Sequence, residues 1–175
     1  MAITKIQSES LNLSDNYDFT GTVTGAGGNN NPSFFAVSTS TEDNVNVADN
    51  TLTKMTFSTE VYDTDSCYDN STNYRFTPTT AGKYFIFAKA MTDNIIDSAQ
   101  SKLEFYKNGS QMDDQYRVRE KNGNASGDTE QTLTLSAIID MNGTTDYIEV
   151  YGAHNNGGNT GGLYDKHFGA YKIIT

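Results

Sequence analysis

One short segment, GKYFIFAKA at residues 82–90, constrains the fold of this chain more than any other. Read as a β-strand, it places Tyr84 and Ile86 on one face and Phe85 and Phe87 on the other. Alternation with apolar side chains on both faces is typical of a strand that is covered on both sides. The segment therefore belongs to the interior of a larger β-structure, because a lone surface hairpin has one apolar face at most.

The composition also favours an all-β fold. Apolar residues make up only 35% of the 175 residues, yet the chain contains 11 Tyr and 9 Phe, residues that fit pleated sheets. Helical periodicity is absent, and the length suits one domain with a short extension. Asn-Gly dipeptides separate apolar alternations in the second half, and Asn-Gly favours tight strand reversals. These dipeptides begin at Asn108, Asn122, Asn142 and Asn156.

Period-two patterns and turn residues predict strands along most of the chain. Between two of them, residues 92–101 are expected to form a polar loop with an apolar tip, Ile95 and Ile96, that either packs back on the domain or contacts a neighbour. Besides the segment 82–90, the expected strands are 33–37, 52–61, 74–78, 102–107, 115–120, 131–140, 146–153 and 166–174.

Several spaced residues resemble the globular head of the complement q subcomponent, whose fold is related to the tumour necrosis factor ligands. The gap between Tyr68 and Phe76 is one residue longer than in that family, and Ile86 stands where the family prefers Phe. Segments LEFYKNG (103–109) and HFGAYKI (167–173) are similar to later family strands. The matching positions are Phe57, Asp63, Tyr68, Phe76, Gly82 and Tyr84.

This resemblance implies an antiparallel jelly-roll sandwich of about ten strands, spanning residues 33–175. It also implies a homotrimer, because the family packs three such heads about an axis through aromatic-rich faces. Tyr147, Tyr151 and Tyr171 are expected to point outward from their strands. We therefore predict a trimer interface formed by Tyr147, Tyr151, Tyr171, Phe85 and Phe87.

Residues 1–32 differ from the rest and read as an extended arm followed by a Gly/Asn linker. The arm resembles virion-attachment and stem repeats of bacteriophage appendage proteins. It has too few apolar residues to fold alone, so it is expected to order against another chain or surface, the alternative being a polar tail without a role. The candidate attachment residues are Leu11, Leu13, Phe19 and Val23.

The net charge and a few individual residues argue against several classes of function. The formal net charge of -10, without a basic cluster, argues against a nucleic-acid partner. The N-terminal residues predict neither a signal peptide nor membrane insertion. The lone Cys67 is expected to be buried.

No cofactor is predicted. The acidic stretch after Asp63 does not match a calcium-binding loop, because it lacks Gly at the position where the loop needs it. A calcium ion bound at the surface is left open, with no residue assigned to it.

Neither histidine lies in a recognisable catalytic motif, so the chain is not expected to be an enzyme. Polar loops at 123–130 and 154–164 are predicted to build the outward end of the head, where any ligand would be met, with permissive surface loops as the alternative. The residues predicted to face a ligand are Ile95, Ile96, His154, Asn155, Asn156 and Asn159.

These features together lead to a functional prediction. The chain is expected to be a bacteriophage virion structural protein, made in the host cytoplasm and displayed on the particle surface as a capsid decoration or a short fibre. Its expected partners are itself, other virion proteins and a host surface glycan or protein. The alternatives are a host-recognition adhesin at a tail-fibre tip and, more distantly, an enzyme that degrades surface polysaccharide.

Overall fold

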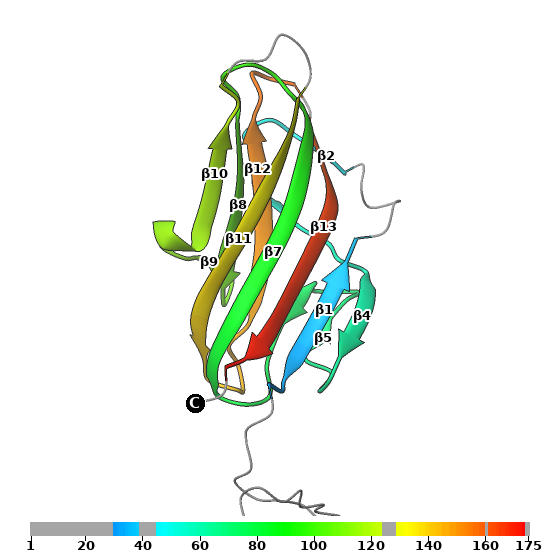
Figure 1. Cartoon of the computed structure of the whole chain (residues 1–175), viewed down its shortest axis with the longest axis vertical. Helices are drawn as coiled ribbons and strands as arrows, with labels where there is room; N and C mark the ends of the chain where they lie inside the picture. Colours follow the sequence, from blue (N-terminus) through cyan, green and yellow to red (C-terminus); the bar gives the residue numbers. More distant parts are fainter. Residues whose placement is uncertain (1–29, 39–44, 124–128, 160, 174–175) are drawn as a thin grey trace, which may run out of the picture.

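The computed structural model describes residues 30–38, 45–123, 129–159 and 161–173, and these form two antiparallel β-sheets packed face to face (Figure 1). The described residues contain no α-helix, only a short 3₁₀ turn at Asp114–Tyr116, and no helix among them could span a membrane. The predicted all-β class is confirmed.

The β7 sheet, as we name the first layer, has the strand order β11-β7-β13-β1-β4, with β2 paired to β13. Its longest strand contains the segment that dominates the sequence, and it pairs with β11 over nearly its whole length. The bounds are β1 Ser33–Val37, β2 Val45–Val47, β4 Thr59–Asp63, β7 Gly82–Ile95, β11 Thr129–Met141 and β13 Gly161–Lys172.

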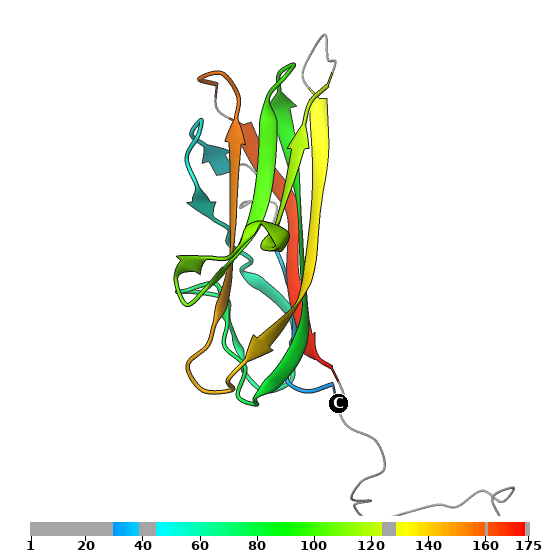
Figure 2. The ribbon, with the colours of Figure 1, turned by 90° about the vertical axis from the view of Figure 1, so that its left-hand side faces the viewer.

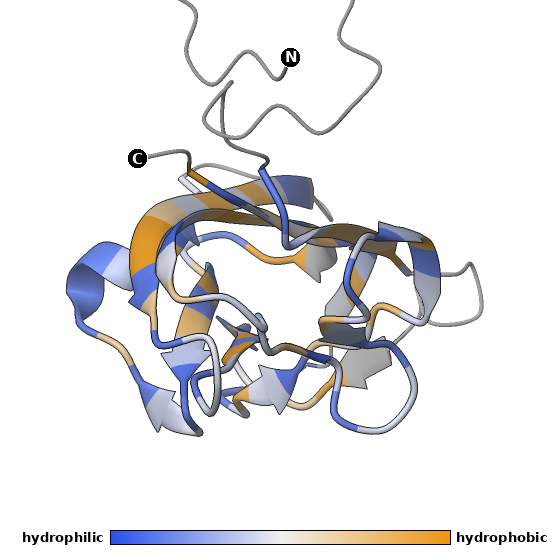
Figure 3. Cartoon of the chain, turned by 90° about the horizontal axis from the view of Figure 1, so that it is seen from below, coloured by the Kyte–Doolittle hydropathy of each residue, from blue (hydrophilic) through white to orange (hydrophobic). Residues whose placement is uncertain are grey.

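The β8 sheet, the second layer, has the order β10-β8-β12-β6-β5, with β3 paired to β12 and β9 paired to β8. Figure 3 shows the two layers from one end, one above the other. The bounds are β3 Thr53–Lys54, β5 Tyr68–Asp69, β6 Arg75–Phe76, β8 Gln100–Lys107, β9 Ser110–Gln111, β10 Arg117–Lys121 and β12 Ile148–Asn155.

The core between the sheets is built around aromatic rings. Phe168 on β13 lies at its centre, with ring centroids 4.9 Å from Phe34, 5.5 Å from Phe57, 5.8 Å from Tyr68 and 6.5 Å from Phe105. Large rings bury much apolar area per residue, which explains how a chain with few aliphatic residues closes a core. Each of these rings is at most 5% exposed.

Most expected strands are present, but three expectations were wrong. The expected strand 52–61 is divided into β3, which belongs to the β8 sheet, and β4, which belongs to the β7 sheet. β7 continues to Ile95, so residues 92–95 belong to a strand rather than to a loop. β13 begins at Gly161, five residues before the expected start. Glycine there reflects close packing, since a Cβ at Gly161 would lie 3.0 Å from the imidazole of His154. The Gly-rich composition suggested a loop because glycine weakens the period-two pattern.

The described chain enters and leaves at one end of the sandwich, which we call the proximal end. The backbone N–H of Lys172 lies 3.2 Å from the carbonyl oxygens of Asn30 and Pro32. The opposite, distal end carries the β7–β8, β12–β13 and β2–β3 connections, at the top of Figure 1.

Asp49 in the β2–β3 connection holds the distal end together. Its carboxylate accepts hydrogen bonds from the backbone N–H groups of Asn156 and Gly158, the latter at 2.9 Å. The Asn156 bond is the main cause that lowers the pKa of Asp49. The side-chain oxygen of Asn156 in turn accepts from the N–H of Ile96 at 2.9 Å. The β12–β13 loop is thus held in place by a residue of another connection rather than by its own side chains alone.

Candidate functional site

The outer face of the β7 sheet carries a continuous set of aromatic side chains, which we call the aromatic face. It consists of Phe35 on β1, Phe85 and Phe87 on β7, and His167 and Tyr171 on β13. Cross-strand register brings them together, because Phe85 pairs with Tyr171 and Phe35 pairs with Gly169 beside Phe87. Side chains alternate along a strand, so Phe85, Phe87 and His167 point away from the core. Their sequence neighbours Tyr84, Ile86 and Phe168 point into it.

The rings of the aromatic face touch one another in a chain. The ring centroids are 5.4 Å apart for Phe85 and Tyr171, 6.0 Å for Phe85 and Phe87, and 6.1 Å for Phe87 and Phe35. The imidazole of His167 lies 5.5 Å from Phe35 and 6.0 Å from Phe87. These distances are those of favourable aromatic pairs.

Gly169 gives Phe87 its position at the centre of this set. The two residues are direct cross-strand partners, and a Cβ at Gly169 would lie 2.5 Å from the tip of the Phe87 ring. The ring therefore lies flat over the bare backbone of β13, an arrangement known to compensate for glycine in a sheet. Any side chain at position 169 would lift Phe87 from the sheet and break the aromatic face in two.

Among the described residues, no element covers the aromatic face, whose rings are half-buried to exposed. Tyr171 is 37% exposed, and the neighbouring Ile138 on β11 and Tyr62 on β4 are 56% and 47% exposed. A polar border follows on β11 and β7, where Lys83 Nζ lies 2.8 Å from Asp140 Oδ1. An apolar centre with a polar border is the usual anatomy of a protein interface.

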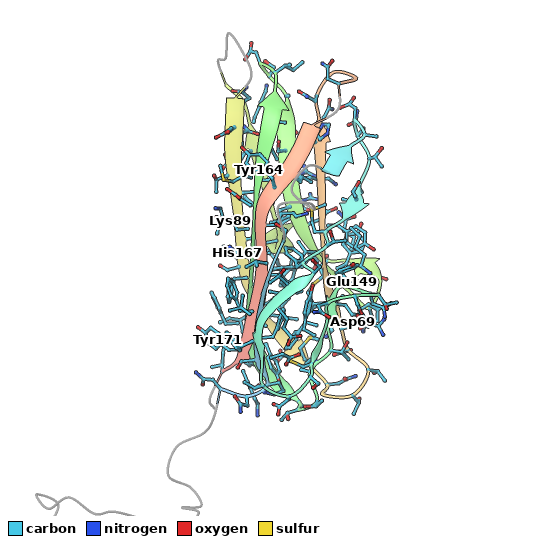
Figure 4. All side chains as sticks on the ribbon, turned by 90° about the vertical axis from the view of Figure 1, so that its right-hand side faces the viewer. Asp69, Lys89, Glu149, Tyr164, His167 and Tyr171 are labelled. Atoms are coloured by element: carbon cyan, nitrogen blue, oxygen red, sulfur yellow. The ribbon has the colours of Figure 1, made fainter. Side chains whose placement is uncertain are left out.

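The predicted interface residues are divided between the two sheets. Phe85, Phe87 and Tyr171 share the aromatic face, as expected. Tyr147 precedes β12, and Tyr151 lies on β12 in the β8 sheet. The ring centroid of Tyr151 lies 4.2 Å from that of Tyr106, and Arg75 lies 4.4 Å above the ring of Tyr147. In Figure 4, Lys89, His167 and Tyr171 lie along one side of the sandwich and Glu149 on the other. One flat interface cannot contain all five predicted residues, and this corrects the prediction.

Three residues predicted to face a ligand are buried. Ile95 and Asn156 are 0% exposed and His154 is 2% exposed. His154 lies between the sheets with Nε2 2.6 Å from the carbonyl oxygen of Val47, and Asn156 holds the adjoining β7–β8 connection. The buried side chains of these residues build the distal end instead of pointing outward. Asn155, Asn159 and Ile96 are exposed, so the Ile95-Ile96 pair is split, with one side chain packed back and the other open.

Two sets of predictions fall on residues that the structure does not describe. Leu11, Leu13, Phe19 and Val23 of the arm lie outside the described residues, as does most of the loop 123–130. The predictions for them stand untested.

The Cys67 thiol and the Asp69 carboxylate make contacts within the fold. Cys67 is buried as predicted, its thiol donates to Asp63 Oδ1 at 3.1 Å, and burial raises its pKa. Asp69 accepts hydrogen bonds from the N–H groups of its own turn, which lowers its pKa. In the described ranges, no three His, Cys, Asp or Glu side chains gather as a metal site requires.

His167 is the histidine of the aromatic face. Partial burial, reinforced by the positive charge of Lys89, lowers its pKa below the ordinary value of 6.5. The imidazole is therefore neutral at neutral pH and packs against the phenyl rings without a charge.

Comparison with known proteins agrees with this architecture. No protein-family model matches the sequence, and no curated protein matches it either. Among solved structures, the globular domain of the zebrafish complement 1qA protein superposes with a TM-score of 0.55 at 15% identity, covering 81% of this chain and 96% of that domain. At this identity the likeness shows the fold, and the antiparallel jelly-roll expected from the sequence is thereby confirmed.

Proposed function

We propose that this chain is a structural head that self-associates as a homotrimer through its aromatic face. The observation that carries the proposal is the contiguous aromatic surface formed by the half-buried rings of Phe35, Phe85, Phe87 and His167 and the exposed ring of Tyr171. Contiguous apolar surface of this kind usually marks an interaction site in a soluble protein. The shared fold supports three copies in particular, since the resemblance to complement q heads implies that arrangement.

The oligomeric state tests this part directly. Light scattering of the purified full-length chain at micromolar concentration is expected to give three times the mass of one chain. A mass of one chain would refute self-association, and a mass of two would refute the trimer.

We further propose that the head is displayed on a bacteriophage particle and anchored by residues 1–32. The support is the resemblance of the arm to phage attachment segments, together with the place where the chain enters the head. Asn30 lies against Lys172 at the proximal end, so the arm joins the head away from the distal loops. Cryo-electron microscopy of whole particles is the decisive measurement, since density on the capsid supports decoration and density on the tail supports a short fibre.

A structural role without catalysis fits the surroundings of both histidines. His154 contacts a backbone carbonyl, and its Nδ1 lies 3.8 Å from Asp49, while His167 packs on phenyl rings. Neither ring is hydrogen-bonded to a hydroxyl or thiol nucleophile among the described residues, the contact that nucleophilic catalysis requires.

Deleting the arm is expected to separate folding from attachment. A chain that begins at Asn30 keeps every described contact of the sandwich, so its melting temperature should match that of the full chain within about 2 °C, less than the shift that 1 kcal/mol produces. Its incorporation into particles should fall below detection, measured by immunoblot of purified virions. Normal incorporation of the truncated chain would show that the head itself makes the attachment.

Acidification is expected to weaken the trimer. The pKa of His167 is already lowered in the single chain, and burial in an interface would lower it further, so the free and unfolded states bind the proton more readily. For association, the contribution of His167 is complete above the lowered pKa of the free chain and is lost as the pH falls below that pKa toward the still lower pKa in the trimer. Sedimentation velocity between pH 8 and pH 5 measures this loss. His167→Gln should reduce the dependence, and an unchanged profile in that variant would contradict the assignment.

A further inference from the structure

The outer face of the β8 sheet contains a depression of about 260 Å³ near the distal end. Three residues that lie side by side on neighbouring strands form its floor. Arg119 on β10 pairs with Lys102 on β8, and Lys102 pairs with Ala153 on β12. Figure 2 looks onto this edge of the molecule, with β10 in yellow-green. The lining of the depression includes Asn50, Gln100, Lys102, Arg119, Ala153 and Asn155.

The residues that line the depression carry positive charge, although the protein as a whole has a negative net charge. The chain has 22 Asp and Glu residues and a formal net charge of -10, yet none of the lining residues is acidic and two are cations. Alternation in β10 adds to this charge. Val118 packs against the core, so Arg117, Arg119 and Lys121 point to the outer face. An anion approaching this sheet would therefore be drawn to this depression.

The cations differ in how far they are already neutralised. Arg117 pairs with Asp114, and Lys102 Nζ lies 3.1 Å from Glu104 Oε1. Glu104 is 1% exposed, and its second oxygen accepts from Gln111 Nε2 at 2.9 Å, so this carboxylate is fully occupied. Arg119 is exposed and makes no ion pair with any carboxylate of the described residues. Its guanidinium is the group available to an anionic ligand.

We propose that this depression binds one carboxylated sugar unit of an acidic polysaccharide. An arginine guanidinium recognises a carboxylate through paired hydrogen bonds. The amides of Gln100, Asn155 and Asn50 supply donors and acceptors for hydroxyl groups. The volume is slightly below that of sites for drug-sized ligands, which suits a single sugar ring. The site lies on the sheet opposite the aromatic face, so it stays accessible in the proposed trimer and does not depend on it.

Titration calorimetry with two matched oligosaccharides tests the proposal. An oligosaccharide that contains glucuronic acid is expected to bind the full-length chain at least about 10-fold more tightly than its neutral glucose counterpart, since a charge-assisted pair adds at least about 1.4 kcal/mol. Arg119→Gln should remove this preference. Arg117→Gln is the matched control, on the same strand and face but already paired with Asp114, and should leave the affinity unchanged.

Each other outcome overturns the proposal. Equal affinity for the acidic and neutral oligosaccharides would refute recognition of the carboxylate. Binding of inorganic phosphate at the same site, without binding of either sugar, would reduce the site to a simple anion contact. Preferential binding of a DNA oligonucleotide through Arg119 would assign the surface to another class of ligand. Chain mass, measured on the same samples, distinguishes these failures from failure of the trimer, since Arg119→Gln leaves the aromatic face intact.

Discussion

Replacing Tyr171 with Asp is expected to convert the proposed trimer into single chains. Tyr171 is 37% exposed at the edge of the aromatic face and contacts only Phe85 among its rings, so the fold should tolerate the change. In an interface the new carboxylate would be buried without a partner, which costs several kcal/mol for each copy. Light scattering at micromolar concentration should then report the mass of one chain, and the melting curve of the isolated head should show that it remains folded.

Tyr147→Asp is the matched control for this result. Tyr147 lies on the side of the sandwich away from the aromatic face, and the new carboxylate would lie near Arg75. The variant should keep the mass of the unsubstituted protein. Dissociation by Tyr147→Asp together with a stable Tyr171→Asp assembly would move the interface to the β8 sheet and refute our assignment.

Replacing Phe168 with Ala is expected to lower the free energy of unfolding by about 3–5 kcal/mol, the usual cost of truncating a buried phenyl ring. The loss should be near the upper end of that range, because Phe168 is fully buried and lies within ring contact of Phe34, Phe57, Tyr68 and Phe105. A loss of that size is a large part of the stability of an ordinary domain. Urea unfolding followed by tyrosine fluorescence measures it.

Phe35→Ala provides the comparison for the core variant. Phe35 adjoins Phe34 in sequence but points to the aromatic face, where it is only half-buried. Its truncation leaves no enclosed cavity, so the loss measured on monomeric protein should be less than half of that for Phe168→Ala. Equal losses for the two variants would contradict the assignment of inner and outer faces.

The central strand could be predicted because its alternation is unusually strict. Tyr84, Ile86 and Ala88 are fully buried, while Phe85 and Phe87 face outward, as the period of two requires. The prediction that both sides of this strand are covered holds for the core side. On the outer side no described part of the chain covers Phe85 and Phe87, and the proposed interface would provide that cover.

The rest of the aromatic face could not be predicted, because it depends on strand order. Phe35 and His167 meet Phe87 only because β13 lies between β7 and β1, and no local pattern states which strands are neighbours. The paired phenylalanines in SFFAV were the available signal, since one of them had to face away from the core. Tyr147 and Tyr151 were misassigned for the same reason, as outward alternation is identical on the two sheets.

The anchoring of the distal loop could not be predicted, because its composition describes only the loop itself. Gly157 and Gly158 have φ values of 64° and 93°, which glycine adopts readily, within a stretch whose Gly and Asn content predicted a surface loop. Its shape is imposed by Asp49, more than 100 residues earlier in the chain. A contact over that separation in sequence leaves no trace in a local pattern.

The proximity of Asn30 and Lys172 has a practical consequence for protein engineering. A domain whose entry and exit points are hydrogen-bonded neighbours can be inserted into a surface loop of an unrelated carrier without stretching either protein. Both junctions then lie at the proximal end, and the distal loops and the depression beside Arg119 project away from the carrier. The head could thus be transplanted whole, and its binding properties studied on a carrier of known oligomeric state.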